Sequence, residues 1–252
     1  MWLALPLPAS AAPKHYAAAD HASFVIGTFE YMRVVGDRTR ATLKVIEGAK
    51  IPPGQTFEIE GSGFDKGTTF FVPLLVKQGR WQLVGRLSAD HHIHRRQGKS
   101  ALAEIEVWQR KSQLPISDRL DHWLNLVSHP VPFLRAASAQ ALRHHRLEIA
   151  PLFTPSRLAV LTTAIQEIEV SDTQRRVIFG LIAALGGDAG ADWVAEGLST
   201  RISGDLRTRA IQFLGRQRSA KALKALSVCA NSTVTASAGL CRRLLGASVP
   251  TK

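Results

Sequence analysis

The sequence predicts an α+β protein in which a small N-terminal β-barrel precedes a stack of about four helix pairs. Two observations predict this fold. From Ser23 to about Arg110 the apolar residues recur with the period of strands, and from Ser117 onward with the period of helices. The helical half also repeats. We therefore expect domains at residues 22–112 and 117–246, with tails at residues 1–21 and 247–252.

Short alternating runs predict five or six strands in the N-terminal half. They lie at residues 24–29, 41–45, 56–60, 70–76, 81–84 and 101–108. Pro52-Pro53-Gly54 marks a turn, and Lys77-Gln78-Gly79-Arg80 suits a hairpin. Short strands joined by turns are typical of a small barrel or sandwich.

Four segments of this half carry a family resemblance. They are Ile26-Gly27-Thr28-Phe29, Val45-Ile46-Glu47-Gly48, the residues 52–57 and the residues 64–71. Together, over about residues 22–85, they resemble the OB-like barrel of the tissue-inhibitor-of-metalloproteinase and netrin-module superfamily, as found in exported bacterial domains. Inhibitory members depend on an N-terminal cysteine, and this region contains none. The resemblance therefore implies a fold and not protease inhibition.

The helical half contains aligned copies of one pattern. Leu134–Leu142, Gln174–Ile182 and Leu206–Gly215 share a register, and Thr233–Gly246 is a degenerate fourth copy. An apolar residue, an arginine, small residues at core spacing and a final Leu-Gly resemble the second helices of HEAT-like repeats. We place the first helices at residues 118–127, 156–168, 191–198 and 220–229. The copies are about 40, 32 and 27 residues apart, which indicates an α-solenoid of helix pairs.

The charge balance favours acidic partners. The chain has 32 Lys+Arg against 20 Asp+Glu, a net charge of +12. Such a surface suits acidic proteins, nucleic acid or anionic lipid. The excess is +5 in residues 1–116 (15 against 10) and +7 in residues 117–252 (17 against 10). Because it is spread over both halves, a dedicated nucleic-acid face is less favoured.

Arginines recur at one position of the repeat, at Arg135, Arg175 and Arg207. They either bond the neighbouring turn or form a basic ladder for a partner. The candidate binding residues are Arg95, Arg96, Lys99, Arg135, Arg175, Arg176, Arg207 and Arg209. If Arg95 and Arg96 shared one concave face with Arg135, Arg176, Arg209 and Arg243, nucleic-acid binding would be favoured.

The run SADHHIHRR at residues 88–96 has three interpretations: a solvated loop, an anion contact or a metal site. As a strand it would place only His92 and His94 on one face, whereas zinc sites use three or four ligands. His15 and His21 could add ligands only if the N-terminal segment folded back. We therefore expect no metal or cofactor, and a solvated hairpin turn at Arg95–Lys99.

No catalytic motif is recognisable. The glycine-rich run at residues 61–67 has the wrong spacing for a phosphate loop and is interpreted as a turn. There is no Gly-x-Ser-x-Gly sequence, and no histidine lies near Cys229 or Cys241. If the two cysteines lie on the antiparallel helices of one hairpin, they are displaced from each other by ~10 Å along the helix axis. A disulfide needs Cα atoms within roughly 7 Å, so we expect two separate buried thiols. We expect a protein that is not an enzyme, although a site assembled between the domains is a weaker third hypothesis.

The N-terminus predicts export. The apolar segment Trp2–Pro8 precedes Ala9-Ser10-Ala11, which has the small-x-small form that signal peptidases cleave. The alternative is a disordered Ala/Pro-rich tail in a cytoplasmic protein. No run approaches the roughly 20 apolar residues of a membrane span. The predicted function is a non-enzymatic scaffold, periplasmic or secreted, that binds an acidic protein or peptide on the curved solenoid face. The alternative function is nucleic-acid binding.

Overall fold

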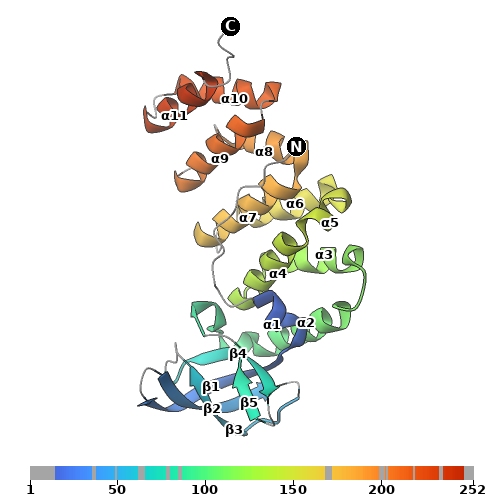
Figure 1. Cartoon of the computed structure of the whole chain (residues 1–252), viewed down its shortest axis with the longest axis vertical. Coiled ribbons are helices and arrows are strands. Elements are labelled where there is room, and N and C mark those ends of the chain that lie inside the picture. The colour runs from blue at the N-terminus through green and yellow to red at the C-terminus, as the bar shows by residue number, and fades with distance from the viewer. Residues whose placement is uncertain are drawn as a thin grey trace. The chain divides into compact units, whose positions relative to one another are not determined.

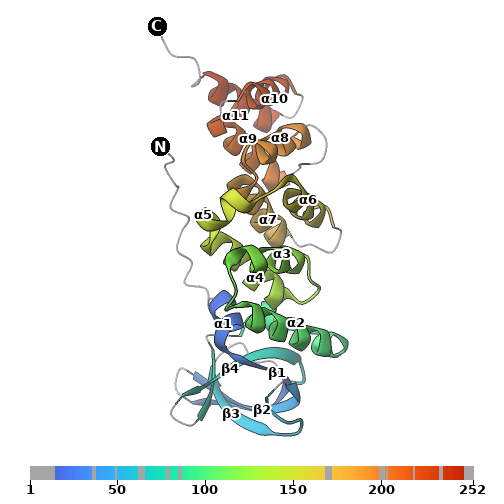
Figure 2. The ribbon, with the colours of Figure 1, turned by 90° about the vertical axis from the view of Figure 1, so that its right-hand side faces the viewer.

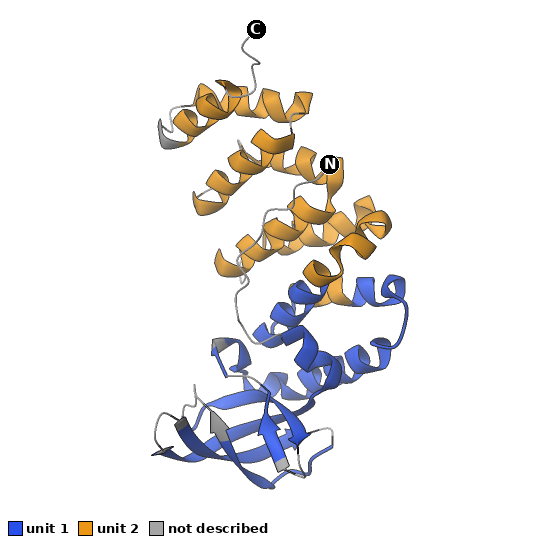
Figure 3. Ribbon diagram, in the orientation of Figure 1, with its two compact units in different colours: residues 1–122, 129–141 blue, residues 123–128, 142–252 orange. Residues whose placement is uncertain are grey.

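The computed structural model describes residues 15–35, 38–48, 50–61, 66–77, 80–84, 87–167, 172–198, 202, 204–217, 219–232 and 235–246. A nearly closed antiparallel barrel is followed by helices, which confirms the α+β fold class (Figure 1). The chain divides into two compact units (Figure 3). Unit 1 comprises residues 1–122 and 129–141, and unit 2 comprises residues 123–128 and 142–252. The predicted boundary at residues 112–117 stays a prediction.

Five strands form one antiparallel sheet in the order β3-β2-β1-β4-β5. They are β1 (Ser23–Val35), β2 (Arg38–Gly48), β3 (Thr56–Gly61), β4 (Thr69–Lys77) and β5 (Arg80–Leu83). The long β1 pairs with both β2 and β4 and carries two register shifts. Bulges increase the twist of a strand, and the edge strands β3 and β5 approach each other. The sheet therefore curls into a nearly closed barrel.

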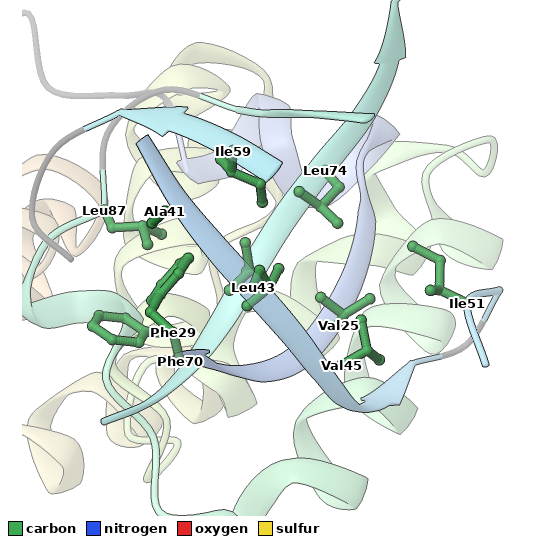
Figure 4. Close-up of a cluster of buried hydrophobic side chains, with 11 residues drawn as sticks. Val25, Phe29, Ala41, Leu43, Val45, Ile51, Ile59, Phe70, Leu74 and Leu87 are labelled. Atoms are coloured by element: carbon green, nitrogen blue, oxygen red, sulfur yellow. The ribbon is translucent and has the colours of Figure 1, made fainter. Parts of the chain in front are cut away.

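The barrel interior is filled by aliphatic and aromatic side chains from every long strand. Phe29, Leu43, Phe70 and Leu74 are all fully buried there (Figure 4). Gly27 lies at the first register shift of β1, where a β-carbon would stand 2.5 Å from the Leu43 Cδ1 atom. Only glycine fits this approach of two strands.

The outer face of the sheet is covered by helices of unit 1. Phe24 and Phe71 stack with ring centroids 4.7 Å apart, and Phe133 packs edge-on against Phe24 at 5.2 Å. Phe133 belongs to α4 (Pro132–His144). Residues 24–27 of β1 and 70–74 of β4 are buried without a break, and these two segments are accordingly continuous apolar runs, whereas β2 alternates polar and apolar residues.

The predicted strand at residues 101–108 is wrong. These residues belong to the helix α2 (Gly98–Lys111). Leu102, Ile105 and Trp108 are buried at a spacing of three residues, which is one face of a helix. The alternation of Ile105 and Val107 imitated a strand, but Ala, Leu and Glu are strong helix formers.

The expected tail also needs correction, because residues 15–21 form the helix α1 (His15–His21). Trp108 donates a hydrogen bond from its indole Nε1 to the carboxylate of Asp20 at 2.7 Å. The Gln109 side-chain amide donates to the carbonyl oxygens of Ala19 and Ala22 at 3.2 and 2.7 Å. These bonds hold α1 against α2. Residues 1–14 and 247–252 lie outside the described residues.

Apart from the short α5 (Arg146–Ile149), the remaining α-helices form consecutive pairs close to the predicted positions. They are α3 (Ile116–Leu126) with α4, α6 (Pro155–Ala164) with α7 (Asp172–Leu185), α8 (Gly187–Gly197) with α9 (Gly204–Gln217), and α10 (Ala220–Ala230) with α11 (Thr235–Gly246). The helix expected at residues 156–168 ends earlier, at Ala164, and residue 168 lies outside the described residues. In unit 2 the first helices α6, α8 and α10 form one layer, and the second helices α7, α9 and α11 form the other (Figure 2). Equivalent apolar residues of the repeat are buried, including Leu142 and Leu214.

The two cysteines form a disulfide, so the prediction of separate thiols is wrong. The Cα atoms of Cys229 and Cys241 are 6.1 Å apart. We expected Cys229 to lie opposite Val234, but its sulfur lies 3.6 Å from the carbonyl oxygen of Ser237. Ser237 and Cys241 are one helical turn apart, or ~6 Å. This shift in register brings the two sulfurs within bonding reach.

Candidate functional site

The recurrent arginines bind the ends of preceding helices. Arg135 donates a hydrogen bond to the carbonyl oxygen of His129 at 2.9 Å, and Arg207 donates to that of Leu198 at 2.7 Å. Arg175 donates to the carbonyl oxygen of Glu167 at 3.3 Å. In each case a second helix supplies the guanidinium, and the oxygen belongs to a residue one to three positions beyond the end of its first helix. Carbonyl groups in such connections need donors from outside the helix.

This geometry matches the structural role considered for the repeat arginines. All three side chains are half-buried, and their fork of donors suits carbonyl oxygens. In the fourth pair Arg242 donates from its Nε to the carbonyl oxygen of Ala230 at 3.1 Å. Sequence alignment missed Arg242 because it lies near the end of α11 and not at its start. Binding of a partner by the repeat arginines stays a prediction.

Arg176 and Arg209 occupy different surroundings. Both are about half exposed, and both direct their Nε toward the same carboxylate oxygen of Asp205, at 3.3 and 3.4 Å. Asp205 and Arg209 are four residues apart on α9, whereas Arg176 lies on α7. One carboxylate thus links two second helices, and the two guanidinium groups with this carboxylate leave a net charge of +1 on the surface of unit 2.

Beside this pair lies a polar groove of about 440 Å³, which we call the α7–α9 groove. Asp172, Arg175 and Arg176 contribute from α7, and Trp193 contributes from α8. Trp193 could not be predicted as a groove residue from the sequence, because aromatic residues in amphipathic helices usually belong to the core. Charged groups around an indole suit a polypeptide segment better than a small apolar molecule.

A second groove of about 370 Å³ lies between the first helices α8 and α10, and we call it the α8–α10 groove. Leu198, Ala225 and Val228 contribute apolar surface to it. On its rim Lys221 forms ion pairs with Asp192 at 3.0 Å and Glu196 at 2.9 Å. The hydrogen bond that the Lys221 ammonium donates to the Glu196 carboxylate is the main cause that raises the pKa of Lys221.

Three further candidate residues lie in unit 1. Arg95 and Arg96 belong to the short helix η2 (Arg95–Gln97), and Lys99 follows in α2. The expected hairpin turn is wrong, because the chain passes from η2 directly into a helix. All three side chains are exposed, and within the described part of the chain they have no acidic partner. Arg135 also belongs to unit 1, while Arg175, Arg176, Arg207 and Arg209 belong to unit 2.

The histidine run before them is largely structural. His91 is 1% exposed, its Nδ1 accepts a hydrogen bond from the backbone N–H of Ser88 at 3.1 Å, and its ring lies 5.2 Å from that of His15. Burial is the main cause that lowers the pKa of His91 to about 3. His92 packs edge-on against Phe70 at 4.7 Å. The expected solvated loop is therefore wrong for His91, although His94 is exposed.

Comparisons with family models, curated proteins and solved structures give no match. The surfaces must therefore be interpreted from their own chemistry. Across the described ranges, no three His, Cys, Asp or Glu side chains are grouped as metal ligands. No described helix is long and apolar enough to cross a membrane.

Proposed function

We propose that this protein is a non-enzymatic scaffold that binds an acidic segment of another protein on the second helices of unit 2. In this proposal the helix pairs form a HEAT-like solenoid, and the barrel is OB-like. The binding surface consists of the exposed residues of α7, α9 and α11, which we call the second-helix face.

The separation of charge between the two helix layers carries this proposal. The second helices α7, α9 and α11 contain seven arginines and two aspartates, a net charge of +5. The first helices α6, α8 and α10 contain three basic and three acidic residues, a net charge of zero. A surface of one sign attracts partners of the opposite sign and orients them on approach.

The exposed residues of the second-helix face support a protein ligand. They combine arginines with neutral hydrogen-bonding groups: Arg176, Thr208, Arg209, Gln212, Arg216 and Arg243 are exposed or about half exposed. Guanidinium groups bind carboxylates with paired hydrogen bonds, and arginine is enriched in protein interfaces.

The disulfide supports the proposal of export. Disulfides persist in secreted and periplasmic proteins and are rare in the cytosol, where thiols are kept reduced. The bond between Cys229 and Cys241 joins α10 to α11 and leaves no free cysteine among the described residues. A periplasmic or secreted location also argues against nucleic acid as the usual partner.

Binding of poly-L-glutamate, measured by fluorescence anisotropy, tests the acidic-partner proposal. The double variant Arg176→Gln/Arg209→Gln should lose most of the affinity. The matched control Arg143→Gln/Arg146→Gln removes the same charge from exposed arginines outside the second-helix face and should bind as the parent does. Equal losses in both variants would show a general charge effect and would overturn the proposal.

The second candidate function, nucleic-acid binding, is favoured by the same net charge. A single-stranded oligonucleotide with the same number of charges as the glutamate polymer distinguishes the two. Protein binding predicts that the polymer binds at least as tightly as the oligonucleotide at 150 mM salt. Tighter binding of the oligonucleotide, with a steep dependence on salt, would favour the nucleic-acid function instead.

A further inference from the structure

The α8–α10 groove holds polar groups that the folded chain leaves unsatisfied. The hydroxyl oxygen of Ser232 is buried and has no hydrogen-bond partner among the described residues. Buried hydroxyl groups normally have a partner, because an unmade hydrogen bond costs free energy. The exposed Lys224 also lines the groove and forms no ion pair with any described residue.

Between these two polar groups the groove wall is apolar. Val228 is 56% exposed although it is a large hydrophobic residue, and Leu198 and Ala225 lie beside it in the groove. Ala225, Val228 and Ser232 are spaced by three and four residues, so they follow one face along α10 and its C-terminal turn. Lys224 lies four residues before Val228 on the same side.

The spacing of these groups defines the size of a ligand. Lys224 and Ser232 are eight residues apart, which corresponds to ~12 Å at the rise of a helix. An extended polypeptide covers that distance in about four residues, at ~3.3 Å each. A single-headed amphiphile has one polar group and could contact only one of Lys224 and Ser232.

We propose that the α8–α10 groove binds an extended peptide segment that has an acidic residue two or three positions from an apolar residue. The acidic side chain pairs with Lys224, and the apolar side chain covers Val228 and Ala225. A backbone carbonyl oxygen of the peptide accepts a hydrogen bond from the hydroxyl of Ser232.

The rim charges explain the preference for an acidic residue. Lys221 already has two carboxylate partners, Asp192 and Glu196, so that its charge is compensated. Arg207 is engaged with the carbonyl oxygen of Leu198 but keeps its positive charge within the groove. Lys224 is then the cation with room for a ligand carboxylate.

This site is separate from the second-helix face of the proposed function. It lies between two first helices and uses none of the exposed arginines of α7, α9 and α11. Each surface can therefore fail its own test without affecting the other.

Selection from a phage-displayed library of random linear heptapeptides tests the inference with the full-length oxidised protein as target. We expect enrichment of peptides with an acidic residue two or three positions from Leu, Ile, Val or Phe, in one consistent order. Binding of the enriched peptides to Val228→Glu should be reduced about tenfold or more, the effect of losing one good contact. Val228 is exposed, so this substitution leaves the core intact.

Lys224→Glu provides a second readout that misfolding cannot imitate. Selection on this variant should replace the acidic preference by a basic one while the apolar preference remains. Arg209→Gln, on the second-helix face, should give the same peptides as the parent. The inference is overturned if no sequence is enriched, if the peptides bind Val228→Glu unchanged, or if Lys224→Glu still selects acidic residues.

Discussion

The guanidinium of Arg207 binds the carbonyl oxygen of Leu198, the C-cap residue that follows α8, at 2.7 Å. The bond joins the two helices of one pair, and Arg135 and Arg175 make the same kind of contact in theirs. Hydrogen bonds from charged donors are stronger than neutral ones. The repeated arginine therefore has a sufficient structural reason, independent of any ligand.

We predict that Arg207→Met lowers the free energy of unfolding by ~1–3 kcal/mol, because the carbonyl of Leu198 loses a charged donor in a half-buried position. Methionine retains the aliphatic stem of the side chain. Arg209→Met removes an exposed ion pair and should cost under ~1 kcal/mol. Urea denaturation measures both values, and equal costs would contradict the helix-end role of Arg207.

Leu142 and Leu214 occupy equivalent positions of the repeat, and both are fully buried. Replacing either with Ala should cost ~2–5 kcal/mol, because it leaves a cavity in a packed core. Leu147 is a matched control, since it is 81% exposed and its replacement should cost under ~0.5 kcal/mol. Losses below ~1 kcal/mol at both core positions, measured by urea denaturation, would contradict the alignment of the repeats.

The helix pairs could be predicted from the sequence because the buried residues of each second helix recur at helical spacing within that helix. Periodicity failed at residues 101–108, where Ile105 and Val107 suggested a strand. The buried residues Leu102, Ile105 and Trp108 have helical spacing, and their helix also makes distant contacts, such as the hydrogen bond between Trp108 and Asp20. The strands of the barrel were predicted in the same way, from the alternation of apolar residues within each strand.

The candidate sites could be predicted only in part. The arginines were visible in the repeat, but their partners, such as the carbonyl oxygen of Leu198, are backbone groups that no side-chain pattern reveals. The groove around Val228 and Ser232 depends on how α8 packs beside α10. The disulfide between Cys229 and Cys241 depends on a register between helices that the turn length sets.

Reduction of that disulfide should destabilise the last helix pair. In the chain-entropy description, closing a loop of this size stabilises the folded state by ~2–4 kcal/mol, and the bond spans 12 residues. We expect the melting temperature to fall when a phosphine reductant is added. The Cys229→Ser/Cys241→Ser variant should melt at the lower temperature with or without reductant. An unchanged melting temperature of the parent would contradict a stabilising bond.

The division into units predicts how a truncated chain behaves. Residues 116–252 made alone keep α6–α11 but lose the barrel residues Phe24 and Phe71 that cover Phe133. We expect a helical circular dichroism spectrum, with slow amide hydrogen exchange in α6–α11 and fast exchange in the first turn of α4. Exchange that is fast throughout would contradict independent folding of the helical domain.

His91 should make the stability of unit 1 depend on pH. Its ring lies among His15, His92 and Asp90, and burial is the main cause that lowers its pKa to about 3. An unfolded histidine has a pKa of about 6.5. Between these values the unfolded chain binds a proton that the folded chain does not. The stability that neutral His91 provides is therefore complete above pH ~6.5 and is lost as the pH falls toward 3.

Lowering the pH from 7.5 to 5.5 should thus cost ~1.4 kcal/mol through His91 alone. Burial also lowers the pKa values of His122 and His129 to about 4, so these residues add losses of the same sign. In urea denaturation at both pH values, His91→Asn should show a loss smaller by that amount. The control His94→Asn, at an exposed position, should behave as the parent. If His91→Asn and the parent lose equal stability between the two pH values, His91 is not neutral in the folded protein at pH 5.5.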